Sequence, residues 1–213
     1  MGGLGEQDPL AELSLGQFLD RLAGRTSMPA GGVVCALQAA QAAALVAMAA
    51  KFSSAEDSGS LTELAADSDR LVTEALRLAE EDQRVYAGVK AAYSLPSTRP
   101  DRQDLLAQAL VEASGPPAGV VSLAGQVVTL AERLLPVLNP MLEADLAVAA
   151  DVAHAAASGA RSTIEANLRW LNHGDGAEPV LASLDDVDPI LERARAVRES
   201  LRRKNASEPA HPT

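Results

Sequence analysis

The sequence predicts an all-α protein, built as a helical bundle around one central alanine-rich helix. Apolar residues recur at the three-to-four-residue spacing of helices along much of the chain. Residues 33–52 form an alanine-rich run with almost no charge. Alanine is the best helix former, and its small side chain lets neighbouring helices approach closely. The aromatic content of only 2% argues against a β-rich core.

The chain of 213 residues is expected to form one domain. We expect a disordered N-terminus over residues 1–13, a single helical domain over residues 14–204 and a disordered tail over residues 205–213. A domain of this size buries roughly 70% of its unfolded surface, so it needs neither disulfides nor metal to fold. The single cysteine, Cys35, is expected to be a small core residue.

Composition argues against several classes of partner. The net charge of −11 and the scarcity of aromatic residues disfavour nucleic acid. The N-terminus lacks the basic and apolar regions of a signal peptide, and Gln38 and Gln41 interrupt the apolar run of nearly membrane-spanning length. We therefore expect a cytoplasmic protein with no nucleic-acid or membrane partner. His154, His173 and His211 show no metal-binding spacing, so no metal is expected.

A glycine turn leads into the central helix, which is predicted over residues 33–52. The turn reads Pro29-Ala30-Gly31-Gly32. Glycine lets a ligand or another backbone come close, and the first turn of a helix exposes free N–H groups. The turn is therefore a candidate binding element for an anionic or carbonyl oxygen.

A long helix beginning at Ser60 carries the first candidate catalytic residue. Its apolar residues follow the spacing of a core seam as far as Ala92, and Asp82 interrupts that seam. An ionised carboxylate in a buried seam is unfavourable unless it is paired or hydrogen-bonded. Two interpretations stay open. Asp82 is either solvated or bonded to the start of a neighbouring helix, or it belongs to a functional site.

The remaining helices are delimited by caps and prolines. Ser14 and Gln17 predict a capping box that starts the first helix, and Gly24 is expected to end it. A later helix is expected to end at Gly115, with Pro116-Pro117 starting another.

The helix after Pro140 carries two further candidate site residues. It is expected to continue to about Leu171. Asp145 and Asn167 lie twenty-two residues apart in it, so at 100° per residue their directions differ by only about 40°. We therefore expect them to share one face of this helix.

The order of these motifs resembles the cyclodeaminase/cyclohydrolase family, which includes the C-terminal domain of formiminotransferase-cyclodeaminase and the methenyltetrahydrofolate cyclohydrolases. That family has a short first helix, a Pro-Gly-Gly-Gly-Ser turn and a helix of the kind seen here. The resemblance covers roughly residues 14–172. The matching positions, in order, are Pro29 to Val33, Asp82, Tyr86, Leu95-Pro96, Asn139 to Asp145, Gly159-Ala160 and Asn167.

The resemblance implies long antiparallel helices, a homodimer and a folate-type substrate, with no separate cofactor. In such enzymes water adds to the methenyl carbon between two folate nitrogens, or ammonia leaves a formimino group as that ring closes. Either reaction needs a group that moves a proton and negative charge near a cationic carbon. The resemblance implies that Asp82 and Asp145 are catalytic. The implied substrate-binding residues are Pro29, Gly31, Gly32, Tyr86, Asn139 and Asn167.

Five positions of the family pattern differ in this chain. They are Ala30, Val33, Met141, Ala144 and Thr163. Where the family carries a basic Gly-Lys stretch, residues 55–58 are acidic here. Two functions stay open. One is a folate-dependent cyclohydrolase or cyclodeaminase, a hydrolase or lyase. The other is a catalytically inactive helical homodimer that serves as a binding or scaffolding module.

Overall fold

A computed structural model describes residues 9–54, 58–169 and 177–207. These residues contain helices and no strand, so the all-α prediction is confirmed. The elements in chain order are η1 (Leu10–Glu12), α1 (Leu15–Ala23), α2 (Gly31–Lys51), α3 (Ser58–Tyr93), α4 (Arg102–Leu134), η2 (Leu135–Val137), η3 (Pro140–Leu142), α5 (Glu143–Leu168), α6 (Glu178–Asp185) and α7 (Val187–Ser207).

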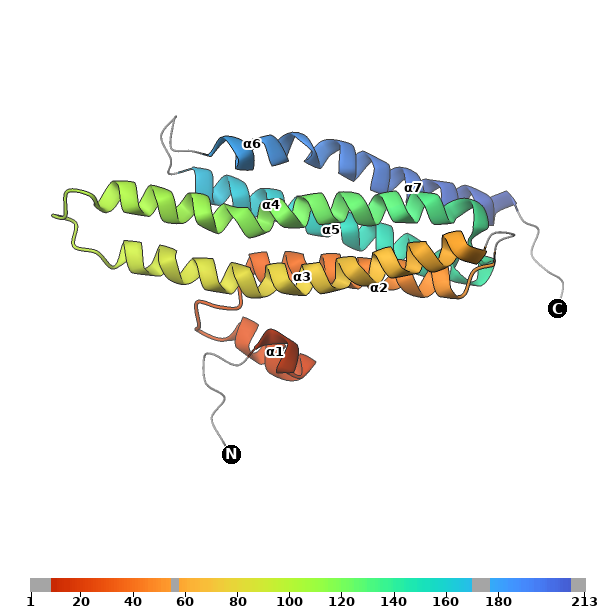
Figure 1. Ribbon diagram of the computed structural model, residues 1–213, viewed down its shortest axis with the longest axis horizontal. Helices are drawn as coiled ribbons and strands as arrows, with labels where there is room; N and C mark the ends of the chain where they lie inside the picture. Colours follow the sequence, from red (N-terminus) through yellow and green to blue (C-terminus); the bar gives the residue numbers. More distant parts are fainter. Residues whose placement is uncertain (1–8, 55–57, 170–176, 208–213) are drawn as a thin grey trace.

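Helices α2, α3, α4 and α5 form a bundle in which consecutive helices run antiparallel (Figure 1). In this view α3 and α4 lie in front of α2 and α5. Helix α2 packs on α3, α4 and α5, while α7 lies along α5. The α3–α4 hairpin extends beyond the N-terminal end of α2 (Figure 1). The predicted bundle of long antiparallel helices is therefore confirmed.

Helix α2 is the buried centre of the bundle, as predicted. Most of its buried residues are alanines, which allow its neighbours to pack closely. The helix begins at Gly31 rather than at Val33, with Ala30 as its N-cap. This corrects the predicted turn, because Gly31 and Gly32 form the first turn of the helix itself. The Ala30 side chain accepts no capping hydrogen bond.

Two helical segments have the length and composition of membrane spans. They are Gly31–Lys51 and Arg102–Val137, and 61% and 50% of their most apolar windows are buried inside the protein. The core helix of a bundle has the same composition, and the packing of α2 against three other helices accounts for its apolar character.

The predicted domain ends need correction. Helix η1 lies within the segment 1–13 that was expected to be disordered, and Leu10 packs against the core. Helix α7 continues to Ser207, past the predicted limit at residue 204. Residues 1–8 and 208–213 lie outside the described residues. At the first helix, the predicted capping box of Ser14 and Gln17 is present.

Helix α4 passes through Pro116 and Pro117 without ending, so the predicted break at Gly115 is wrong. Proline has no N–H, and Pro117 therefore cannot make the helical hydrogen bond to the Ala113 carbonyl four residues earlier. Asn167 of α5 replaces that donor, since its Nδ2 lies 3.3 Å from the Ala113 oxygen. A neighbouring helix thus satisfies the carbonyl that the proline leaves unpaired.

We expect Asn167→Ala to lower the free energy of unfolding by about 1–3 kcal/mol, because it leaves the Ala113 carbonyl unpaired. In a Pro117→Ala background the restored N–H at position 117 can bond to that carbonyl, so Asn167→Ala should have a smaller effect. Urea unfolding of the four proteins measures this coupling. Equal effects of Asn167→Ala in both backgrounds would show that the amide does not compensate for the proline.

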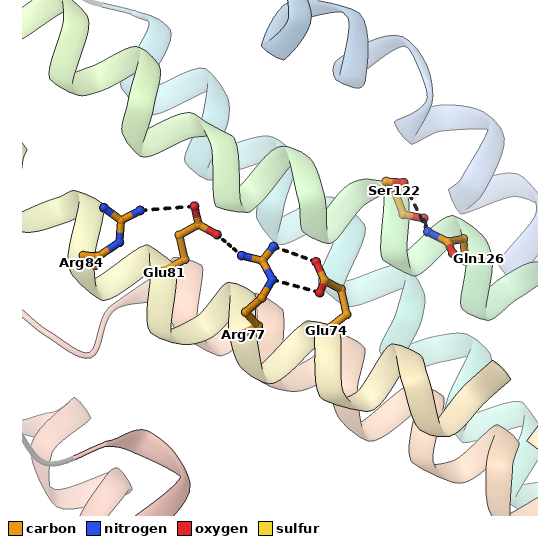
Figure 2. Close-up of polar contacts among 6 residues, drawn as sticks. All are labelled: Glu74, Arg77, Glu81, Arg84, Ser122 and Gln126. Atoms are coloured by element: carbon orange, nitrogen blue, oxygen red, sulfur yellow. Dashed lines mark hydrogen bonds and ion pairs between the residues drawn. The ribbon is translucent and has the colours of Figure 1, made fainter. Parts of the chain in front are cut away.

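The outer face of α3 carries a row of ion pairs. Glu74, Arg77, Glu81 and Arg84 follow one another at helical spacing, and Arg77 lies 2.7 Å from Glu74 (Figure 2). Exposed pairs of this kind contribute little stability, about 0–1 kcal/mol each. The row therefore identifies the side of α3 that faces water.

Candidate functional site

The Asp82 carboxylate lies against the first turn of α2. It sits on the buried seam of α3, is 9% exposed, and accepts a hydrogen bond from the Val33 backbone N–H. Gly32 permits this approach, because a β-carbon at that position would overlap the carboxylate. The structure thus confirms the interpretation that Asp82 bonds to the start of a neighbouring helix. It also identifies the glycine that admits the side chain.

Burial changes the acidity of this carboxyl. It raises the pKa of Asp82 from an ordinary value of 3.8 to about 6, and the hydrogen bond from the Val33 N–H opposes that rise. A carboxyl with a pKa near 6 exchanges its proton readily close to neutral pH. The site therefore combines negative charge with a group that can accept and return a proton.

The raised pKa predicts how stability depends on pH. The unfolded chain releases the Asp82 proton near pH 4, whereas the folded protein holds it to about pH 6. The folded state thus binds more protons between these values, and stability falls as the pH rises through this window. Across this pH window, we expect the free energy of unfolding of the wild type to fall by up to about 3 kcal/mol more than that of Asp82→Asn. Urea unfolding of both proteins from pH 4 to pH 7 tests this, and a constant difference would contradict it.

Three other predicted site residues lie at the same end of α2. Tyr86 follows Asp82 by one turn of α3 and is half-buried. Pro29 is buried just before α2 and is joined to Met28 by a cis peptide bond. Gly31 is exposed, and nothing lies within 4 Å of the place where its β-carbon would be. The backbone at Gly31 is therefore accessible to a ligand beside Asp82.

Helix α5 closes the other side of this end of α2. The Cys35 sulfur packs so closely on Gly159 that a β-carbon there would lie 2.6 Å from it. Burial, with a smaller effect of the Asp82 charge, raises the pKa of the Cys35 thiol to about 11. The thiol stays protonated, and the prediction that Cys35 is a core residue is confirmed. Asn167 lies further along α5 at the same end, where its amide donates to the Ala113 carbonyl.

Asn139 and Asp145 lie at the opposite end of the bundle. The Asn139 amide donates to the Phe52 carbonyl at 2.9 Å, and its oxygen accepts from the Met141 N–H at 3.0 Å. From Gly32 to Phe52, α2 rises by about 30 Å. Asp145 stands in the first turn of α5, close to Asn139 in sequence.

A single chain therefore does not bring Asp145 together with Asp82. Asp145 and Asn167 share a helix, but twenty-two residues separate them by about 33 Å along its axis. The eight predicted site residues divide into two groups. Pro29, Gly31, Gly32, Asp82, Tyr86 and Asn167 lie at one end, and Asn139 and Asp145 at the other.

The substituted positions have separate structural roles. The Val33 side chain is fully buried in the core, and only its backbone N–H contacts Asp82. The hydroxyl that the family pattern has at this position is therefore not needed for that hydrogen bond. Thr163 donates its hydroxyl to the Gly159 carbonyl at 3.2 Å, whereas Met141 is 85% exposed. The acidic positions 55–57 lie outside the described residues.

A cavity of about 560 Å³ lies at the Asn139 end of α2, and sequence reasoning missed it. Lys51 and Asp69 face each other in its wall, with a nitrogen–oxygen distance of 2.9 Å. The other lining residues are Ala50, Ser53, Ser54, Leu61, Thr62, Ala65 and Ala66. A signal was present, since Lys51 is the one charged residue of α2. A cavity of this volume can hold a small molecule.

No metal-binding group is present in the parts of the chain that the structure describes. Over residues 9–54, 58–169 and 177–207, no three His, Cys, Asp or Glu side chains are grouped so as to hold a metal ion. The polar groups that the Gly31 end of the bundle offers to a ligand include the Asp82 carboxylate and the backbone N–H groups at the start of α2.

This arrangement of helices is shared with a protein of solved structure. A solved structure of formiminotetrahydrofolate cyclodeaminase from Thermotoga maritima matches with a TM-score of 0.78 and 24% identity. The match covers 90% of this chain and 98% of that chain, and it shows a shared fold. The sequence also matches the formiminotransferase-cyclodeaminase family over residues 14–186. The chain belongs to this family, which confirms the resemblance. A search among curated proteins gave no match.

Proposed function

We propose that the protein is a folate-dependent enzyme of the cyclodeaminase/cyclohydrolase type, with Asp82 as its proton-transfer residue. Membership of the formiminotransferase-cyclodeaminase family supports the substrate class, formimino- or methenyltetrahydrofolate. The observation that carries the proposal is the position of Asp82. Its buried carboxylate, with a pKa of about 6, adjoins an accessible helix start at Gly31.

The chemistry needs one group to accept a proton and give it back. In deamination, a folate nitrogen attacks the formimino carbon and forms a new carbon–nitrogen bond. The attacking nitrogen loses a proton to the Asp82 carboxylate. Asp82 then returns a proton to the departing nitrogen, the original carbon–nitrogen bond breaks and ammonia leaves. The ionised carboxylate also stabilises the cationic methenyl carbon.

The same group serves the hydrolytic reaction. Water adds to the methenyl carbon as Asp82 takes one of its protons, and Asp82 passes that proton to a ring nitrogen. The bond between the carbon and that nitrogen then breaks, while the new hydroxyl loses its remaining proton to solvent and becomes the formyl carbonyl. The exposed backbone at Gly31 is placed to bind a carbonyl oxygen of the substrate, as helix starts do for anions. We propose that the enzyme is a cytoplasmic homodimer, in line with the family.

Turnover and binding measurements on the full-length protein test this function. Formiminotetrahydrofolate should yield methenyltetrahydrofolate and ammonia, or methenyltetrahydrofolate should be hydrolysed faster than in buffer. Absorbance of the methenyl group follows both reactions, and calorimetry follows folate binding. Turnover no faster than buffer, together with no heat of folate binding, would contradict the proposal. That result would favour the inactive scaffold.

A further inference from the structure

Lys90 lies on α3 about two turns after Asp82, at the end of the bundle that carries the candidate site. Its ammonium nitrogen donates a hydrogen bond to the Ser27 hydroxyl at 2.9 Å. Ser27 belongs to the segment that leads into α2, and Asp82 lies against Gly32 at the other end of that segment. Residues 27–32 therefore run alongside α3 from one of these charged side chains to the other.

The positive charge of Lys90 has no acidic partner among residues 9–54, 58–169 and 177–207. The other basic residues of α3 differ in this respect, since Arg70, Arg77 and Arg84 each pair with an aspartate or a glutamate one turn away. The positions three and four residues before and after Lys90 hold no acidic side chain. A neutral hydroxyl thus holds the ammonium group in place and leaves its charge uncompensated.

This charge is available to a ligand. Lys90 is exposed, and a lysine ammonium has three N–H donors, of which the Ser27 hydroxyl takes one. The whole chain carries a net charge of −11, so an anionic substrate needs a local cation to approach it. Lys90 supplies such a cation beside a site whose other charged group, Asp82, repels anions when it is ionised.

A folate has the dimensions to reach both Asp82 and Lys90. Its reacting carbon is followed by a benzoyl ring and then by a glutamate that carries two carboxylates. Ordinary bond lengths place the nearer carboxylate roughly 10 Å from the reacting carbon. Eight residues of α3 separate Asp82 from Lys90, which corresponds to a rise of about 12 Å. A substrate whose reacting carbon lies at Asp82 therefore extends its carboxylates to the level of Lys90.

Tyr86 lies between the two charged residues, one turn of α3 from each. It is half-buried and packs on a small apolar cluster of the α3–α4 hairpin. At 100° per residue, each of the three side chains is turned by only about 40° from the one before it. An aromatic side chain at this position suits contact with the benzoyl ring. Asp82, Tyr86 and Lys90 thus follow the order of the reacting carbon, the ring and the carboxylates.

We propose that Lys90 binds a glutamate carboxylate of the folate and so selects substrates that carry this group. This inference rests on the proposed function, since the comparison of lengths starts from a folate whose reacting carbon lies at Asp82. Ser27 holds the ammonium group beside the segment 27–32, and the carboxylate accepts from the N–H groups that Ser27 leaves free. Lys90 therefore sets the affinity for the substrate, whereas Asp82 carries out the proton transfer.

Calorimetry with two unreactive ligands tests this assignment without any measurement of turnover. The ligands are folic acid and an analogue in which methylamine replaces the glutamate, so that the amide remains and both carboxylates are absent. We expect the wild type to bind folic acid about 10-fold more tightly than the analogue, as hydrogen bonds to charged groups do. Lys90→Met keeps the length of the side chain without its charge and should bind both ligands equally. Equal affinities in the wild type would overturn the proposal.

Two further variants separate the charge of Lys90 from its contact with Ser27. Lys90→Arg keeps the charge and should keep most of the preference for folic acid. Arg84→Met removes a cation from the water-facing side of the same helix, where Arg84 is 72% exposed, and should leave both affinities unchanged (Figure 2). If Lys90→Met weakens the binding of both ligands by the same factor, the lysine only fixes the segment 27–32 and the proposal is wrong.

Steady-state kinetics with formiminotetrahydrofolate distinguish this inference from the proposed function. Lys90→Met should raise KM about 10-fold and leave kcat unchanged, because the carboxylate contact is the same in the ground state and the transition state. A fall in kcat at unchanged KM would contradict the assignment. A wild type that shows the Lys90-dependent preference for folic acid but no turnover would contradict the proposed function alone. A wild type that turns over folate but binds both ligands equally would overturn the role of Lys90 alone.

Discussion

Asp82→Asn should lower kcat by about 10²- to 10⁴-fold, the range that a positioned proton-transfer group contributes. Asparagine has nearly the same shape, and its amide oxygen can still accept the hydrogen bond from the Val33 N–H. It cannot accept a proton from the attacking nitrogen, and it carries no charge to stabilise the methenyl carbon. The steady-state rate of ammonia release from formiminotetrahydrofolate measures the loss.

Glu80→Gln is the matched control for this substitution. Glu80 precedes Asp82 by two residues on α3 and is exposed, so the control removes one negative charge from the same helix outside the site. It should leave kcat within about twofold of wild type, because a charge in water is screened. A rate for Asp82→Asn as high as that of the control would show that Asp82 acts only as a cap for α2.

Gly32→Ala should disrupt both folding and activity. The new methyl group would occupy the space of the Asp82 carboxylate, which must move away from the Val33 N–H. Overpacking of this kind destabilises by about 1–3 kcal/mol, and displacement of Asp82 should remove turnover. Thermal or urea unfolding measures the first effect, and the folate assay measures the second.

Gly31→Ala and a double variant are the controls for Gly32→Ala. The position of a β-carbon at Gly31 is open, so alanine there should be neutral or stabilise the helix by up to about 1 kcal/mol. In an Asp82→Ala background the Gly32→Ala methyl group has room, and its destabilisation should largely disappear. If Gly32→Ala destabilises equally with and without the carboxylate, the contact with Asp82 is not the reason for the glycine.

Local patterns allowed much of the fold to be predicted. The capping box at Ser14, the buried alanine helix and the seam of α3 each follow from residues close together in sequence. The break at Gly115 was predicted wrongly because the donor that compensates for Pro117 comes from Asn167, fifty residues later. The positions of the prolines alone do not indicate which neighbouring side chain will donate a hydrogen bond to the unpaired carbonyl.

The candidate site was predictable only in part. Asp82 could be singled out because it is a charged residue in an apolar seam. Its hydrogen-bond donor is the backbone N–H of Val33, and a backbone donor cannot be predicted from the type of side chain at that position. The helical wheel placed Asp145 and Asn167 on one face but ignored the rise along the axis that separates them.

The pH dependence of kcat/KM for formiminotetrahydrofolate shows directly whether the buried Asp82 carboxyl transfers the proton. The free enzyme should lose activity below about pH 6, where Asp82 becomes protonated. The residual activity of Asp82→Asn should lack that dependence. A wild-type profile that is flat between pH 5 and pH 7, or a decline near pH 6 that persists in Asp82→Asn, would contradict the claim.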